Sequence, residues 1–600
     1  MDGWNGKILR VDLTDGKFAT EELDPDLAKD FIGGRGLASK ILFDEIDPQV
    51  DALSPENKLI FATGPLTGTR AATSARYMVV TKSPLTGAIA CSNSGGYFGP
   101  ELKFAGYDLI IFEGKSDRPV YLWIENDQVE LRGGNNLWGK NTHQTEDLIK
   151  TETHKNAKIA CIGPAGEKLV RIAAVMNDKN RAASRSGVGA VMGSKNLKAI
   201  AVKGSKRVRI ADNEAFKKAN ALVLEKIKSA PPTAEGLPNL GTAMGVNFFN
   251  AFHLLPTRNF QEGFFEGAEN ISGEAIAQNI FVKRKACYAC PIGCGRVTKV
   301  KDPEFQGEGE GPEYETIAAL GSNCRVDNLD AIARANYYCN ELGLDTISAG
   351  VTIACAMELY EKGLLTEREV GFKLNFGNAR ALVELIKKMG LREGFGDILA
   401  EGGYRMAERY GHPEIFMGVK KQEFPGFQVR GLQGNGLGFA TSNRGACHLR
   451  AGMYGPEVFG IPEKIDPLDT KDKALWVKKL QDLGAVIDST GLCVFIAFAG
   501  IGLETVLPIL EAATGVKGDI ESILLAGERI WNLERLFNLR AGITTKEDNL
   551  PLRMLKEPMP EGPYKGQVVR LDEMLSEYYQ LRGWDEYGNP TSEKLTELDI

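Results

Sequence analysis

Cys287-Tyr-Ala-Cys290-Pro-Ile-Gly-Cys294-Gly295 is the stretch from which the interpretation of this chain starts. Three cysteines this close, in a segment with Pro and Gly, have the spacing of ligands to one metal centre. Cys493, at the end of Asp488-Ser-Thr-Gly-Leu-Cys493, supplies a fourth thiol. We expect Cys287, Cys290, Cys294 and Cys493 to hold one iron–sulfur cluster, with a structural zinc ion as the alternative.

The Gly-Leu ending of the Cys493 segment occurs a second time, in Asn340-Glu-Leu-Gly-Leu-Asp345. One loop ends in a thiol and the other in a carboxylate. Gly343 can end a helix in a left-handed turn, and Asp345 can cap the helix that follows. A generic helix joint that occurs twice by chance is the alternative. The cysteine at the equivalent position favours a pseudo-symmetric pair of cofactor loops, one of them beside the cluster, and hence a redox enzyme.

The composition describes an ordinary globular chain of 600 residues, 43% hydrophobic and 25% charged, which is long enough for three or four domains. Its net charge of -7 and its lack of clustered Lys/Arg with interleaved aromatics exclude a nucleic-acid site. The first thirty residues contain several acids and no apolar core, so we expect no secretory signal and a cytoplasmic location. The most apolar segment, residues 491–510, contains Glu504 and Pro508. We expect it to be buried core and not a membrane span.

The pattern of apolar residues changes along the chain. Short β-branched or apolar runs predict strands at Lys7–Leu13, Tyr77–Thr81, Leu109–Glu113, Val120–Ile124, Ile159–Ile162 and Ala199–Val202. Helical periodicity follows at Glu214–Ser229, Leu329–Leu342, Thr346–Lys362 and Asp519–Leu539. We therefore predict an α+β fold with a β-rich domain of two packed sheets (residues 1–210) and two mostly helical domains (211–426 and 427–600). The cofactor would lie at their junction. A continuous loop within one helical domain is the alternative to a boundary at Phe427–Gly438.

Asp488 lies five residues before Cys493, so their Cα atoms are at most about 18 Å apart. Whatever Asp488 binds therefore lies close to the cluster. A carboxylate suits the guanidine-like edge of a pterin, which offers neighbouring N–H donors to two acceptor oxygens. Each of the two loops could hold one pterin.

With these features together, the chain resembles the tungsten-containing aldehyde:ferredoxin oxidoreductase family over nearly its whole length. Besides the cysteines, the matching motifs are Trp4-Asn-Gly-Lys-Ile-Leu-Arg-Val-Asp12, Gly64-Pro-Leu-Thr-Gly68, Arg76, Asn93-Ser-Gly-Gly-Tyr-Phe-Gly99, Arg181-Ala-Ala-Ser-Arg185, Gly189-Ala-Val-Met-Gly-Ser-Lys-Asn-Leu-Lys198, Glu313-Tyr-Glu315, Arg444-Gly-Ala-Cys-His448 and Tyr578-Tyr-Gln-Leu-Arg-Gly-Trp584.

The resemblance implies one tungsten held by two pterins, a Mg²⁺ that bridges the pterin phosphates, and a [4Fe-4S] cluster next to one pterin. It implies pterin contacts by Arg76, Asn93, Gly95, Arg181, Ala182, Ser184, Arg185, Asn340, Leu344, Asp345, Arg444, Arg450, Asp488 and Leu492. Fork-shaped guanidinium donors among glycines are what anionic pterin phosphates need. A surface ion pair is the alternative for any single arginine.

Three residues are expected to act on the substrate. His448 would hydrogen-bond the substrate carbonyl or the oxygen on the metal, and Glu315, with Glu313 nearby, would accept a proton from water. The alternative is that His448 is structural and that both glutamates are cap or surface residues.

Two positions depart from the family pattern. Asn340 stands where the first pterin loop usually begins with Asp, so the side chain adds no charge there. Some relatives join two subunits through a metal held by a Glu and a His, but the matching region here includes Arg334 and has no histidine between His253 and His412. An oligomer is therefore not inferred from this feature.

The implied reaction is oxidation of an aldehyde by water to the carboxylic acid. Electrons would pass from tungsten through the cluster to ferredoxin or to an iron–sulfur partner subunit, alone or in a complex with a flavin subunit, and acid reduction would be the reverse reaction. The alternatives are a tungsten-dependent aromatic acyl-CoA ring reductase subunit and a non-catalytic electron-transfer protein.

Overall fold

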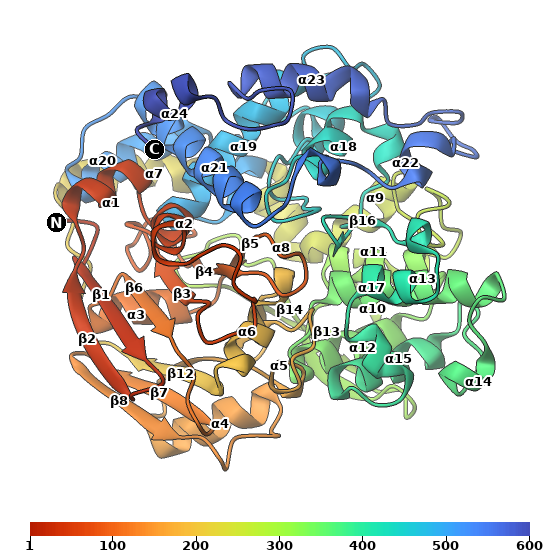
Figure 1. Cartoon of the computed structure of the whole chain (residues 1–600), viewed down its shortest axis with the longest axis horizontal. Helices are drawn as coiled ribbons and strands as arrows, with labels where there is room; N and C mark the ends of the chain where they lie inside the picture. The colour runs from red at the N-terminus through yellow and green to blue at the C-terminus, as the bar shows by residue number, and fades with distance from the viewer.

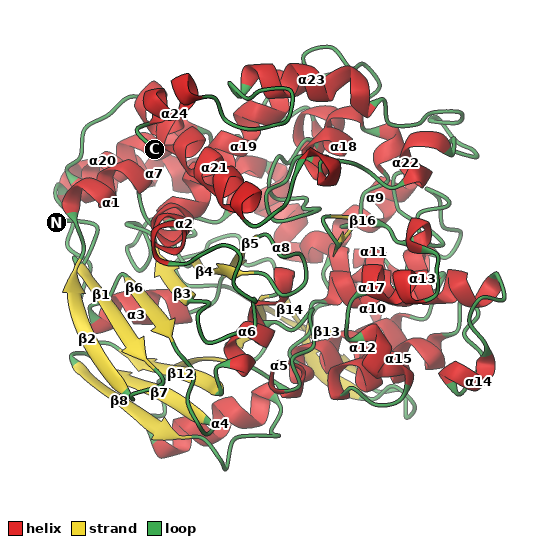
Figure 2. Ribbon diagram, viewed as in Figure 1, coloured by secondary structure: helices red, strands yellow, loops and turns green.

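Two six-stranded sheets and a large helical region make up the computed structural model, which describes residues 1–600 (Figure 1 and Figure 2). The sheets occupy the first third of the chain, and helices dominate the rest. The predicted α+β class with an N-terminal β-rich domain is confirmed.

The first sheet has the strand order β2-β1-β6-β3-β4-β5. Its strands are β1 (Lys7–Asp12), β2 (Lys17–Glu22), β3 (Leu59–Thr63), β4 (Tyr77–Lys82), β5 (Ile89–Ser94) and β6 (Leu109–Glu113). β1 and β6 are parallel, and all other neighbours are antiparallel.

The second sheet repeats this topology with every strand shifted by six, in the order β8-β7-β12-β9-β10-β11. Its strands are β7 (Val120–Glu125), β8 (Gln128–Gly133), β9 (Lys158–Cys161), β10 (Val175–Asn177), β11 (Arg181–Ala183) and β12 (Leu197–Lys203). Again only one pair, β7 and β12, is parallel. The N-terminal domain is thus built from two topologically equivalent halves.

A shared core joins the halves. Buried side chains of both sheets form one cluster with those of α3 (Phe98–Ala105) and α6 (Val188–Ser194). On its other face the first sheet packs against α2 (Gly34–Glu45) and against α21 (Ile520–Arg540), which comes from the far end of the chain. The first sheet is therefore held against a helix from the C-terminal part of the chain.

The predicted strands and helices are all present, with ends that differ by a residue or two. The helices that position the site are α7 (Asn213–Ser229), α11 (Tyr314–Leu320), α12 (Leu329–Leu342), α13 (Thr346–Glu361), α18 (Gln433–Ala440), α19 (Lys473–Thr490) and α20 (Leu503–Thr514). A small antiparallel sheet of β13 (Phe281–Lys285), β14 (Gly295–Val300) and β15 (Gly307–Glu310) lies among them.

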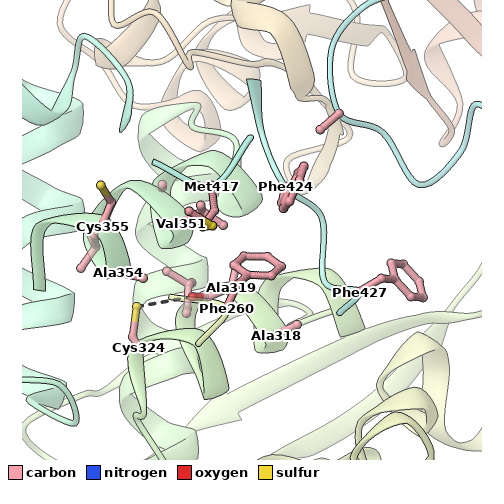
Figure 3. Packing of buried hydrophobic residues seen from close by; sticks show 14 of the residues in the cluster. Phe260, Ala318, Ala319, Cys324, Val351, Ala354, Cys355, Met417, Phe424 and Phe427 are labelled. Carbon is pink, nitrogen blue, oxygen red and sulfur yellow. Dashed lines mark hydrogen bonds between the residues drawn. The ribbon is translucent and has the colours of Figure 1, made fainter. Parts of the chain in front are cut away.

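The largest core cluster of the helical region has members on both sides of residue 427. Figure 3 shows Ala318 on α11 and Val351 on α13 near Phe424 and Phe427 of the loop after β17 (Gln422–Glu423). The proposed division at residue 427 stays a prediction. No helix of the chain combines the length and the apolar character that crossing a membrane requires.

The two related loops occupy equivalent places on the two halves. Gly491 ends α19 in a left-handed turn (φ 91°) and accepts a hydrogen bond from the backbone N–H of Arg76, directly before β4. Gly343 ends α12 in the same way (φ 77°) and accepts one from Ala174, directly before β10. Asp345 caps α13, since its side chain accepts from the N–H of Ile347. The predicted helix joints are confirmed, and each one docks on its own sheet.

Candidate functional site

The four expected cluster ligands come from two distant segments. Cys287, Cys290 and Cys294 lie on the loop that joins β13 to β14, and Cys493 follows the joint at the end of α19. The charges of Cys493 and Cys287 help to raise the pKa of Cys290, to about 11, although burial is the main cause. This coupling requires the thiols to lie near one another. No three His, Cys, Asp or Glu side chains are arranged to hold a single metal ion. A four-iron cluster binds each thiolate through a different iron.

Arg76 connects this group of thiols to the joint at the end of α19. Its Nη2 lies 2.9 Å from Cys493 Sγ, and its Nη1 donates to Asn93 Oδ1 at 3.0 Å. Burial opposes the positive charge of Arg76, but the thiolates of Cys493 and Cys287 outweigh it and raise the pKa. Asn93 in turn donates to Asp488 Oδ1 at 3.3 Å. A continuous hydrogen-bonded chain therefore runs from the thiols to the carboxylate expected to bind a pterin.

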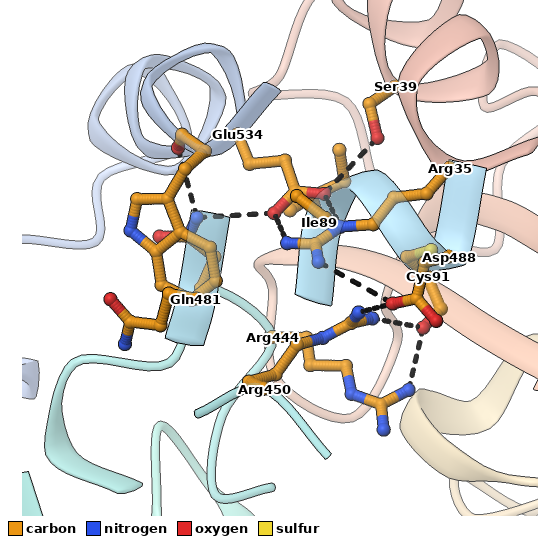
Figure 4. Close-up of polar contacts among 12 residues, drawn as sticks. Arg35, Ser39, Ile89, Cys91, Arg444, Arg450, Gln481, Asp488 and Glu534 are labelled. Carbon is orange, nitrogen blue, oxygen red and sulfur yellow. Dashed lines mark hydrogen bonds and ion pairs between the residues drawn. The ribbon is translucent and has the colours of Figure 1, made fainter. Parts of the chain in front are cut away.

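Asp488 is held by two buried guanidinium groups (Figure 4). Arg450 donates to its Oδ2, and Arg35 Nη1 lies 3.5 Å from the same atom. Arg35 also makes a two-pronged contact with Glu534 on α21, at 2.7 and 2.6 Å. Arg444 and Arg450 both donate to the carbonyl of Cys91, at 2.6 and 2.8 Å. Arg35 and Arg450 thus share the carboxylate of Asp488, and Arg444 and Arg450 share the carbonyl of Cys91.

The joint at the end of α12 has a matching arrangement beside the second sheet. Asp345 lies 3.3 Å from Arg185 Nε and accepts from Ser348 Oγ at 2.7 Å. Asn340 donates its amide N–H to the carbonyl of Glu310 and to Asn180 Oδ1, both at 3.3 Å. An aspartate at this position would have no hydrogen to donate, so the departure from the family pattern fits its surroundings.

One cavity of about 340 Å³ brings most of the expected site residues together. Its walls include Arg76, Gly95, Arg181, Ala182, Ser184, Cys287, Cys294, Glu313, Glu315, Asn340, Leu344 and His448. The other expected site residues are absent from its lining: Asn93, Arg185, Cys290, Asp345, Arg444, Arg450, Asp488, Leu492 and Cys493. Of these, Arg185, Asp345, Arg444, Arg450 and Leu492 are buried, and Asn93 and Asp488 are half-buried.

Glu315 Oε1 and His448 Nδ1, on residues that line the cavity, and Arg35 Nη1 and Arg444 Nε, on residues outside its lining, are buried without a hydrogen-bond partner. An unpaired buried polar group is costly, so such atoms mark places where a bound group can supply the missing contact. The buried cations suit an anionic ligand. The Gly95 position also has no room for a side chain, since a Cβ there would lie 3.0 Å from Cys287 Sγ. The donor set therefore fits an anionic pterin cofactor beside a cluster.

The side chains of Glu315 and His448 lie next to each other in the wall of this cavity. His448 Nδ1 lies 3.8 Å from Glu315 Oε1, and Glu315 Oε2 accepts from the N–H of Gly426 at 2.8 Å. Burial raises the pKa of Glu315 to about 7. Burial, together with Arg185 and Arg444, lowers the pKa of His448 well below its usual value. The pair thus combines a carboxylate that titrates near neutrality with a neutral imidazole.

Glu313 lies on the same cavity wall but has a different partner. It precedes the first residue of α11, and its carboxylate accepts a hydrogen bond from Thr242 Oγ1. Its assigned role as a second acid or base stays a prediction.

Sequence reasoning missed two buried residues beside the site. Arg35 lies in Gly33-Gly34-Arg35-Gly36, where a Cβ on Gly34 would come within 2.6 Å of the carbonyl oxygen of Asp488. An arginine flanked by glycines was the available signal. Cys447 lies 2.8 Å from Arg444 Nη2. Burial opposes its ionisation, but Arg444, Arg450 and Arg185 together lower its pKa.

Comparison with known proteins gives concordant results. Two family models match the chain: "Aldehyde ferredoxin oxidoreductase, N-terminal domain" over residues 8–204 and "Aldehyde ferredoxin oxidoreductase, domains 2 & 3" over residues 218–600. A tungsten-containing aldehyde ferredoxin oxidoreductase of Pyrococcus abyssi is 55% identical over 607 residues, which cover 100% of this chain and 99% of the relative. A Pyrococcus furiosus protein with the same name is 54% identical over 605 residues, with the same coverage.

Two more distant relatives differ in function by name. The WOR-like subunit of an aliphatic sulfonate oxidoreductase of Pyrococcus furiosus is 33% identical and covers 100% of this chain and 97% of its own. Among solved structures, the active-site complex BamBC of benzoyl coenzyme A reductase with 1,5 dienoyl-CoA superimposes with a TM-score of 0.87. It is 29% identical and covers 100% of this chain and 97% of its own.

Proposed function

Because this chain belongs to the aldehyde ferredoxin oxidoreductase family and is an oxidoreductase, we propose that it oxidises aldehydes to carboxylic acids with water as the oxygen source. The observation that carries the proposal is the composition of one cavity wall. Cys287 and Cys294, two of the cluster-type thiols, line the same cavity as the Glu315–His448 pair. The thiols that we expect to pass electrons on and the pair that we expect to move protons therefore line the same cavity.

The family relationship implies a tungsten–pterin cofactor. When bound, this group supplies the acceptor for the two electrons of the oxidation. We propose that the two helix joints hold it, one through Asp488 and the other through residues Asn340–Asp345. The arginines around the joints would hold it as well. Cys287, Cys290, Cys294 and Cys493 would hold a [4Fe-4S] cluster, and the buried arginines suit pterin phosphates bridged by Mg²⁺.

Glu315 and His448 carry the proton chemistry in this proposal. Glu315, with a pKa of about 7, accepts a proton from water as the oxygen is transferred to the carbonyl carbon. Neutral His448 donates an N–H to the carbonyl oxygen, where negative charge develops. The aldehyde and water yield the carboxylic acid, two protons and two electrons. The electrons leave one at a time to ferredoxin or to an iron–sulfur partner subunit, with or without a flavin subunit, and acid reduction is the reverse.

A second cavity suggests which aldehydes are accepted. It shares Leu449, Tyr454, Phe459, Phe495 and Phe498 with the first cavity. The rest of its lining is mostly apolar, with Trp476, Leu480, Leu483 and Ile487 on one face of α19. We assign this space to the apolar tail of the substrate. A methylene group that moves from water into such a space gains about 0.8 kcal/mol.

Two measurements on anaerobically purified protein test the proposal. Metal analysis should give about one tungsten and four iron atoms per chain, and aldehydes should reduce methyl viologen with formation of the acid. In a series from acetaldehyde to octanal, kcat/KM should rise with chain length, by up to about fourfold per methylene, whereas a flat profile would contradict the assignment of the second cavity.

The same experiment separates the alternatives. Turnover of an aromatic acyl-CoA thioester without aldehyde turnover would favour the ring-reductase function named for the BamBC complex. Iron without tungsten or molybdenum would favour a non-catalytic electron-transfer protein, and zinc alone would reduce the four cysteines to a structural site.

A further inference from the structure

Charge is distributed unevenly around the cluster-type cysteines. The segment Ala275–Lys301, which contains the cysteine loop, has six Lys/Arg residues and no Asp or Glu. The segment Asn57–Pro100, which packs against this loop through the N–H of Thr73 and the carbonyl of Ala289, also has no Asp or Glu. In a chain with a net charge of -7, both segments are therefore basic.

Four of these cations are exposed and form no salt bridge: Arg70, Lys283, Arg284 and, at the end of the segment, Lys301. Arg284 lies over the cysteine loop, because its Nη2 is 3.1 Å from the position that a Cβ would take on Gly293. Arg70 lies two residues after Gly68, whose carbonyl accepts a hydrogen bond from the hydroxyl of Tyr288 in the loop at 3.1 Å. Ala289, the next residue of the loop, is exposed to solvent.

Strand β13 adds an apolar component and a free edge. It packs against α10 (Gly273–Asn279). Phe281 and Val282 expose 38% and 48% of their surface, which is unusual for large apolar side chains. β13 is bonded to β14 on one side only. Exposed apolar residues within a basic rim are typical of a protein-binding surface.

We propose that the surface formed by Arg70, Phe281, Val282, Lys283 and Arg284, here termed the β13 surface, is where an acidic iron–sulfur electron carrier docks. This inference rests on the proposed function, since it requires electrons to leave through the four cysteines. The positive charge would attract the acidic carrier, and Phe281 and Val282 would bury apolar area against it. The exposed Ala289 lies within the cysteine loop, so a carrier bound here is separated from the thiols by that loop alone.

Each docking event transfers one electron and no atoms. The reduced cluster is oxidised, and one oxidised carrier is reduced. One aldehyde yields two electrons, so two carrier molecules dock in turn for each acid molecule formed.

The test compares two electron acceptors with the loaded enzyme. The variant Arg70→Glu/Arg284→Glu should raise the KM for a purified ferredoxin of net negative charge about tenfold or more, and should weaken its direct binding in a titration by a similar factor. The rate with methyl viologen, a small cation that needs no docking surface, should stay within about twofold of wild type. Raising the salt from about 0.05 to 0.5 M should slow ferredoxin reduction by the wild type far more than by the variant.

Two further variants make the result decisive. Arg70→Gln/Arg284→Gln removes the charges without reversing them and should give an intermediate KM. Lys556→Glu/Lys565→Glu changes two exposed lysines outside the β13 surface and should leave ferredoxin kinetics unchanged. Unchanged ferredoxin binding in Arg70→Glu/Arg284→Glu, with viologen activity intact, overturns the docking site. Absence of aldehyde-dependent viologen reduction in the wild type would instead overturn the proposed function.

Discussion

Glu315 is the residue whose surroundings give the sharpest prediction. One of its oxygens is bonded to the N–H of Gly426, while the other is buried and unpaired 3.8 Å from His448. If it acts as the base, kcat/KM should fall as the pH drops below about 7, where the carboxylate becomes protonated. His448 should not titrate in this range, because its pKa lies well below the usual value.

Glu315→Gln tests this role with two readouts. Turnover should fall about 100-fold or more, and the dependence on pH near 7 should disappear, while tungsten and iron stay bound. The folded protein holds the Glu315 proton more tightly than the unfolded chain, so ionisation destabilises the fold as the pH rises from 4.5 to about 7. Glu315→Gln should therefore gain thermal stability at pH 8. An unchanged rate would remove Glu315 from the mechanism.

At the scale of the element, the two helix joints place the site. The joint at the end of α19 meets Gly64 of the first sheet, where a Cβ would lie 2.2 Å from the carbonyl carbon of Thr490. The joint at the end of α12 meets Gly163 of the second sheet, where a Cβ would lie 2.2 Å from the carbonyl oxygen of Leu342. Each half of the domain therefore brings one glycine against one helix end, and this close approach holds the joint in place.

Gly491→Ala should disrupt both the fold and the cluster. Gly491 has φ 91°, and a Cβ there would lie 2.2 Å from Thr67 Oγ1. Gly363→Ala is the matched control, because Gly363 has φ 72° with no atom within 4 Å of the added Cβ. The control should lose about 1 kcal/mol of stability, while Gly491→Ala loses more and binds less iron per chain. Equal iron content and equal melting temperatures in the two variants would contradict this account of the joint.

At the scale of the whole molecule, the N-terminal sheets, the cysteine loop and the C-terminal helices enclose a set of buried cations. Arg185, Arg444 and Arg450 are all almost fully buried. Their mutual repulsion is relieved when an anionic group binds among them, and a ligand that binds only the folded state stabilises it. Protein produced without tungsten and without pterin should therefore melt several degrees lower than the loaded enzyme in calorimetry. Identical melting curves would show that the buried arginines are neutralised within the chain.

Much of the fold could be predicted from local sequence patterns. The strand runs and the helical periodicity depend on neighbouring residues alone, so elements such as β6 and α12 were predicted with the bounds that the structure has. The left-handed glycines and the Asp345 cap were predicted for the same reason. The repetition of the six-stranded topology was not predicted, because strand order depends on pairing between segments that are distant in sequence.

The candidate site could be predicted from the sequence only in part. The cysteine spacing and the motifs that resemble the family identified Cys287, Glu315 and His448 as candidates. The sequence could not show that Glu315 lies 3.8 Å from His448, more than a hundred residues away, or that Arg35 on α2 reaches Asp488 on α19. The contact between Arg35 and Asp488 arises when α2, α19 and α21 pack together.

By itself, the sequence determined the spacing of the cysteines, the two related loops, the class of fold and the family, because these depend on residue type, spacing and periodicity. The tertiary structure alone decided which carboxylate titrates near neutrality, which arginines share one carboxylate, and which cations lie exposed beside the cysteine loop. The physical reason is that pKa values, ion pairs and surface charge depend on burial and on distances through space. Those are fixed only when distant segments fold against one another.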